Sequence, residues 1–119
     1  MASRGRWNNY IKSYVPEFER QFRVYLDCHD GSRSFISANL VDSFDPSLIE
    51  QVDDDKEYVV LNLNYKTIDG QHDVLTACFE VVESNSFEFV LGDDYLHHYY
   101  YGNEGIILEG GEVKIYSRG

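Results

Sequence analysis

The sequence predicts a mainly β protein, with α+β as the alternative class, on three observations. Apolar and polar residues alternate through most of the chain, short turn signals separate the alternating segments, and helical periodicity is confined to short stretches. We expect about seven strands in an antiparallel meander that curls into a barrel or roll, with an N-terminal helix and a second short helix. The length of 119 residues is typical of a single domain, which we expect to span residues 1–119.

The two helices are predicted from different signals. Residues 6–14 place apolar side chains at the spacing of one helical face, namely Trp7, Tyr10, Ile11 and Tyr14. Near residues 46–51, Asp45 can cap a short helix and Pro46 suits its first position.

The strands are predicted from alternation of period two and from the turns between them. The turn signal Asp69-Gly70 separates the two longest alternating segments, 58–68 and 73–83, which predict a long hairpin. At ~3.3 Å per residue such strands are long for a small protein, and long strands twist strongly, which favours a barrel or roll. The other strands are expected at 21–28 and 34–43 (a first hairpin), 86–91, 104–109 and 112–117.

Charge is distributed unevenly along the chain, whose net charge is −11. Residues 1–23 carry five basic and two acidic residues, a net +3, whereas residues 34–113 carry seventeen acids against Lys56 and Lys66, a net −15. A field of that sign repels nucleic-acid phosphates and anionic lipid and attracts basic proteins. We therefore expect a basic protein partner, no direct nucleic-acid binding and no membrane contact. The alternative is that the acids only keep the protein soluble.

No catalytic or metal-binding motif is present in the sequence. The spacings HxH, HExxH, CxxC, GxSxG and GxGxxG are all missing, so we predict neither an enzyme nor a cofactor. One alternative remains, because the connections 29–33, 69–72 and 92–103 fall at the same end of a meander. They would bring together all four histidines, the alternative candidate ligands of a metal or small molecule: His29, His72, His97 and His98.

The leading hypothesis is an acidic protein-binding or inhibitory module that docks on a basic surface, such as the nucleic-acid-binding site of an enzyme. Carboxylates would contact Arg and Lys, and exposed tyrosines would act as anchors. The candidate contact residues are Asp53, Asp54, Asp55, Glu57, Asp93, Asp94, Tyr95, Tyr99, Tyr100, Tyr101 and Glu104. A homodimer is a further option. The N-terminus lacks the apolar core of a secretory signal, so the expected location is cytoplasmic.

Overall fold

Nine strands and two short α-helices follow one another in the computed structural model, which describes residues 9–27, 29, 31–43, 49–53, 55–99, 105–107 and 109–115. They are β1 (Tyr10–Val15), β2 (Arg20–Leu26), β3 (Phe35–Ser37), α1 (Ala38–Val41), β4 (Ile49–Asp53), β5 (Lys56–Lys66), β6 (His72–Val82), β7 (Phe89–Leu91), α2 (Asp93–Tyr99), β8 (Gly105–Ile107) and β9 (Val113–Ile115). A 3₁₀ turn, Glu109–Gly111, joins the last two strands.

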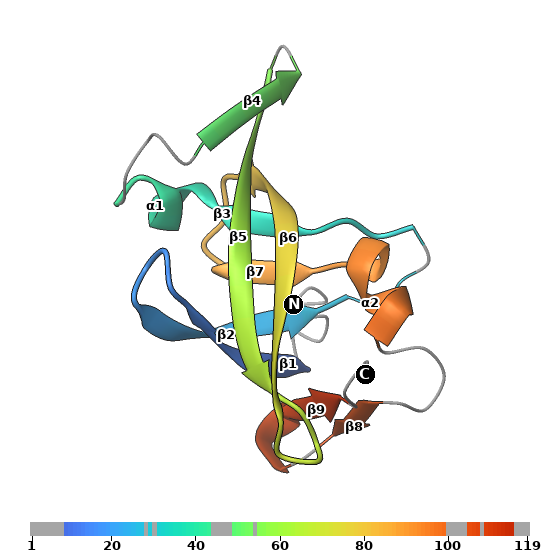
Figure 1. The fold of residues 1–119 in the computed structure, drawn as a ribbon. Helices are drawn as coiled ribbons and strands as arrows, with labels where there is room; N and C mark the ends of the chain where they lie inside the picture. The colour runs from blue at the N-terminus through green and yellow to red at the C-terminus, as the bar shows by residue number, and fades with distance from the viewer. Residues whose placement is uncertain are drawn as a thin grey trace.

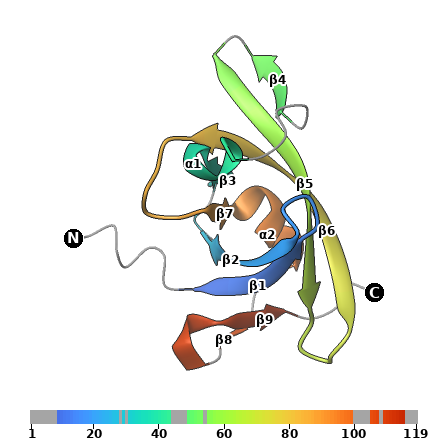
Figure 2. The ribbon, with the colours of Figure 1, turned by 90° about the vertical axis from the view of Figure 1, so that its left-hand side faces the viewer.

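Six of the strands close into a barrel, which confirms the predicted fold class. Around the ring the order is β1, β2, β7, β3, β6 and β5, and β5 returns to β1 where Asn64 pairs with Tyr14. The long hairpin of β5 and β6 forms one wall, and β4 continues the sheet beyond β5 (Figures 1 and 2). The smaller sheet of β8 and β9 lies beside one end of this hairpin.

The N-terminal helix predicted over residues 6–14 is wrong for the part of it that the structure describes. Residues 10–15 form β1, an antiparallel partner of β2. Ile11, Ser13 and Val15 are buried while Lys12 is exposed, so the burial has the period of a strand. Because buried Ser13 breaks the apolar alternation, the sequence resembled a helical face instead. Residues 6–8 lie outside the described residues.

The connectivity also differs from the predicted meander, although two of its antiparallel pairs are confirmed. β5 pairs with β6 and β8 pairs with β9, both antiparallel. The predicted hairpin of 21–28 with 34–43 is wrong, because β2 pairs in parallel with β7, and β3 pairs in parallel with β6. Both parallel pairs join segments that are distant in the chain, so no local turn signal reveals them.

The second helix lies earlier in the chain than predicted. Of the expected helix near 46–51, residues 49–51 belong to strand β4, and residues 46–48 lie outside the described residues. The observed helix α1 instead interrupts the predicted strand 34–43. Its first turn is capped by Ser37, whose Oγ accepts a hydrogen bond from the N–H of Asn39 at 3.2 Å. The N–H of Asp42 closes the helix on the carbonyl of Ala38 at 2.9 Å.

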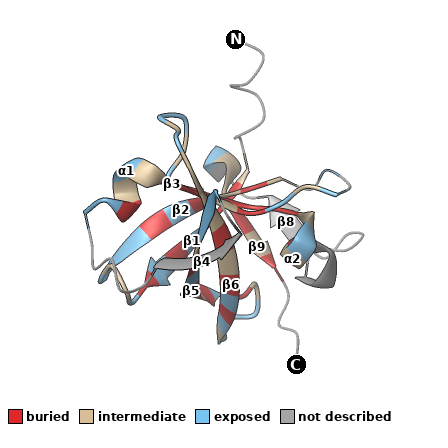
Figure 3. Ribbon diagram, turned by 90° about the horizontal axis from the view of Figure 1, so that it is seen from above, coloured by how far each residue is buried: buried red, intermediate tan, exposed pale blue. Residues whose placement is uncertain are grey.

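Aromatic side chains dominate the centre of the barrel. The ring of Phe89 packs edge-on against Phe22 and Phe79, with centroid separations of 5.0 and 5.4 Å, and Phe89 and Phe79 are fully buried. Buried and exposed residues alternate along β2, β5 and β6 as each strand turns one face inward (Figure 3). Among the described residues, no helix combines the length and hydrophobicity needed to cross a lipid bilayer.

Candidate functional site

The most acidic described segment is a hairpin that projects from the barrel, formed by β4 and the first residues of β5. We call residues 49–57 the acidic arm. Its two strands pair from Ile49 with Val59 to Asp53 with Lys56, with an irregular register after Gln51. Figures 1 and 2 show this hairpin standing clear of the ring of strands. The described backbone of the arm therefore extends away from the body of the molecule.

The arm holds four of the predicted contact residues. Asp55 and Glu57 are exposed, whereas the side chain of Asp53 and all of Asp54 lie outside the described part. Over residues 49–57 the sequence has five acids (Glu50, Asp53, Asp54, Asp55 and Glu57) and one base, Lys56, so the net charge is −4. Asp55 and Glu57 thus lie in a projecting hairpin, which the sequence did not indicate.

The second predicted contact region begins with helix α2, whose start is held by two serines. Ser32 Oγ accepts a hydrogen bond from the N–H of Asp93 at 2.8 Å and donates one to the carbonyl of Asp27 at 2.7 Å. Ser34 Oγ donates to Asp94 Oδ1 at 2.8 Å and accepts from the N–H of Gly92 at 2.9 Å. These bonds make the start of α2 part of the internal hydrogen-bond network.

The tyrosines predicted as anchors have different outcomes. Tyr95 packs against the core, and its hydroxyl accepts a hydrogen bond from the N–H of Cys78 at 2.8 Å. Its main contacts are therefore internal. Tyr99 belongs to α2, but its side chain is outside the described part, as are Tyr100, Tyr101 and Glu104.

Among the described residues, the connections 29–33 and 69–72 lie against different elements. Ser32 and the adjoining Ser34 bond the start of α2, but the β5–β6 turn lies against β9, where the N–H of Ile68 donates to the carbonyl of Ile115 at 3.0 Å (Figure 1). His72 is therefore apart from His29, because parallel pairing replaces the meander on which the prediction depended. The side chains of His97 and His98 lie outside the described part. Among the described residues no group of three His, Cys, Asp or Glu side chains is placed to hold a metal ion.

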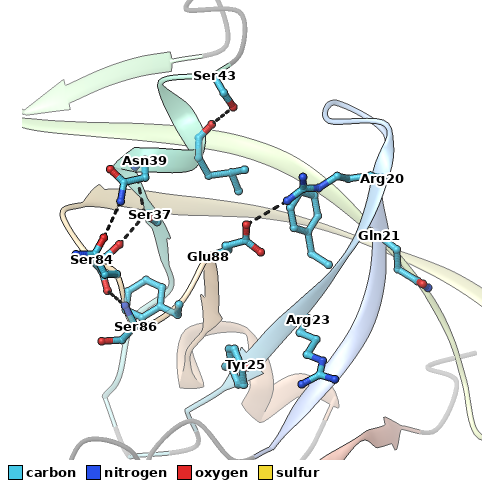
Figure 4. A pocket seen from close by; sticks show the side chains of 14 residues that line it. Arg20, Gln21, Arg23, Tyr25, Ser37, Asn39, Ser43, Ser84, Ser86 and Glu88 are labelled. Atoms are coloured by element: carbon cyan, nitrogen blue, oxygen red, sulfur yellow. Dashed lines mark hydrogen bonds and ion pairs between the residues drawn. The ribbon is translucent and has the colours of Figure 1, made fainter.

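A polar groove of about 720 Å³ was not predicted from the sequence. It lies between β2, the β3–α1 junction and the segment 84–88 (Figure 4). An ion pair crosses it from Arg20 Nη2 to Glu88 Oε2 at 3.1 Å, and the Arg20 guanidinium lies 4.4 Å from the ring centroid of Phe22. The signal that could have found it is the pair of Ser/Asn-rich stretches 34–39 and 84–86.

One side of this polar groove is held together by short polar side chains. Ser37 Oγ donates to the carbonyl of Ser84 at 2.8 Å, and Asn39 Nδ2 donates to Asn85 Oδ1 at 2.9 Å. Such groups can hold water or a polar chain segment by hydrogen bonds. They lack the pairing of a nucleophile with a base that group transfer requires.

Comparison with known proteins gives a distant likeness in structure and none in sequence. No protein-family model matches the chain, and no curated protein matches it. Among solved structures, the chain is similar to the retroviral protease-like domain of Ddi1 from Leishmania major, with a TM-score of 0.48 and 12% sequence identity. The match covers 93% of this chain and 97% of that one.

Proposed function

We propose that this protein is an acidic binding or inhibitory module whose acidic arm docks on a basic surface of a partner protein, such as the nucleic-acid-binding site of an enzyme. The observation that supports this most is the projection of a hairpin with net charge −4 from the barrel. A charge held away from the body meets a partner before the rest of the surface does, and so steers the encounter.

The contacts at the end of the arm would come from Asp55 and Glu57, which are exposed. Carboxylates accept paired hydrogen bonds from arginine, and such charge-assisted bonds are about twice as strong as neutral ones. The rest of the chain also attracts a basic partner at long range, because it carries −7 of the net charge of −11. Binding would therefore be fast and would weaken as salt is added.

The test is capture of partners on the immobilised protein at low ionic strength, followed by titration of each purified partner. The variant Asp55→Asn/Glu57→Gln removes two charges from the arm. The control variant Asp42→Asn/Glu83→Gln removes two exposed charges elsewhere and has the same net charge.

The proposal expects basic partners, affinities that fall steeply with salt, and binding about tenfold weaker in the arm variant than in the control. If the two variants bind equally, or the partners are not basic, the arm is not the docking surface. An inhibitory role further requires that the partner release its nucleic acid when the unmodified protein is added.

A further inference from the structure

The lysines of this acidic chain are concentrated in one place. The sequence contains four lysines, and three of them, Lys12, Lys66 and Lys114, line a single pocket of about 310 Å³ together with His72. We call it the lysine pocket. It is separate from the acidic arm, which carries the fourth lysine, Lys56.

The lysine pocket forms where segments far apart in the chain meet. Its walls come from β1, the end of β5, the start of β6 and β9. Backbone contacts fix these segments: the N–H of Ile68 donates to the carbonyl of Ile115 at 3.0 Å, and Tyr10 forms a parallel bridge with Glu112. The backbone positions of the three lysines are therefore fixed relative to one another, although no sequence motif links them.

The charge balance of the pocket is positive. Its lining has one acid, Glu112, whose Oε1 lies 3.9 Å from Lys12 Nζ. Three lysines and one glutamate give +2 before any charge on His72. Internal pairing with Glu112 thus accounts for one lysine, and two positive charges remain within a chain of net charge −11.

The remaining lining limits the size and nature of a ligand. The pocket is also lined by four residues that are almost fully buried in the core: Ile11, Tyr65, Val113 and Ile115. Ligand pockets start at about 300 Å³ and combine apolar walls with a few convergent polar groups. The lysine pocket reaches this size and has the convergent polar groups, and its volume fits a small molecule and not a folded partner.

We propose that the lysine pocket binds a small dianion, carried as a phosphate group or as a pair of carboxylates on a compact organic body. Lysine ammonium groups bind such anions as point charges with freely turning donors. Lys12 and Lys114 would approach the anion from neighbouring strands, with Lys66 and His72 completing the ring of donors. This binding is independent of the proposed docking of the acidic arm.

The test is an NMR titration of the backbone amides with inorganic phosphate and, separately, with succinate, each against sodium chloride at equal ionic strength. The variant Lys12→Gln/Lys114→Gln removes two positive charges from the pocket. Lys56→Gln/Arg33→Gln, which removes two positive charges outside the pocket, is the control of equal net charge. Lys66→Gln alone provides a second pocket variant, and the dispersion of each spectrum reports that the variant is folded.

We expect saturable shifts at pocket amides with at least one dianion, and the phosphate and succinate arms identify which acid group is preferred. Affinity should fall about tenfold or more in Lys12→Gln/Lys114→Gln and less in the control. Shifts that never saturate with either dianion would overturn the proposal. So would shifts that chloride reproduces, or equal losses in pocket variant and control.

Discussion

The hydroxyl of Tyr95 on α2 accepts a hydrogen bond of 2.8 Å from the backbone N–H of Cys78 on β6. Strand β3 pairs with β6 only from Glu80 onward, so this N–H lies beyond the end of β3. A buried backbone donor without an acceptor is costly, and here a side chain supplies what a neighbouring strand would have supplied. Tyr95 therefore joins α2 to the wall of the barrel.

Replacing Tyr95 with Phe keeps the ring and removes only this acceptor. We expect the free energy of unfolding to fall by about 1–2 kcal/mol, because the N–H of Cys78 loses its partner. Urea denaturation followed by tryptophan or tyrosine fluorescence measures the change. Tyr14→Phe is the control, since 44% of Tyr14 is exposed. An equal effect in both variants would contradict the role assigned to the Tyr95 hydroxyl.

Gly92, directly before α2, has no room for a side chain. A Cβ at this position would lie 2.5 Å from the backbone carbon and oxygen of Arg33. The backbone of Arg33 leads into β3 and cannot move aside without displacing that strand. Gly92→Ala should therefore lower the free energy of unfolding by about 3 kcal/mol or more. Thermal unfolding measures it. Gly70→Asn is the control, since the surroundings of Gly70 are open and asparagine tolerates the φ of 87° at this position. An equally small effect of both substitutions would show that the backbone of Arg33 relaxes and that Gly92 is not required.

We expect the substitution of serine by alanine to have opposite effects at two buried positions, Ser13 and Ser34. Ser13 Oγ is buried and has no hydrogen-bond partner among the described residues, whereas Ser34 Oγ bonds both Gly92 and Asp94. Ser13→Ala should raise the free energy of unfolding by about 1 kcal/mol, and Ser34→Ala should lower it by about 2 kcal/mol. Chemical denaturation of both variants gives the comparison, and changes of the same sign would refute the assignment.

The buried serine also explains which parts of the fold could be predicted. Val59, Leu61 and Leu63 alternate without interruption, and all three are fully buried in the long hairpin that the sequence predicted. In β1 the inward positions are Ile11, Ser13 and Val15, and one polar member was enough to hide the period of two. Local pattern therefore predicts a strand well only where every inward position is apolar.

The arrangement of the strands and of the candidate sites depended on contacts that the sequence does not encode locally. Val24 pairs with Phe89 and Phe35 pairs with Glu80, both in parallel, and no turn links the members of either pair. The lysine pocket has the same origin, because Lys12 and Lys114 come from opposite ends of the chain. The acids of the arm were predicted as a surface because they are contiguous in sequence.

We expect the two acids within β4, Glu50 and Asp53, to have a role different from that of the other acids of the arm. In the part of the sheet that the structure describes, β4 is the end strand and pairs only with β5. An unpaired strand edge can join the edge of another molecule, and charged residues on it oppose that pairing. Glu50→Gln/Asp53→Asn should therefore increase self-association, whereas Asp42→Asn/Glu83→Gln, with the same net charge, should not. Light scattering over a range of protein concentrations measures this. If both variants keep the mass of the unmodified protein, the charges of β4 do not protect its edge, and their contribution is confined to the field of the arm.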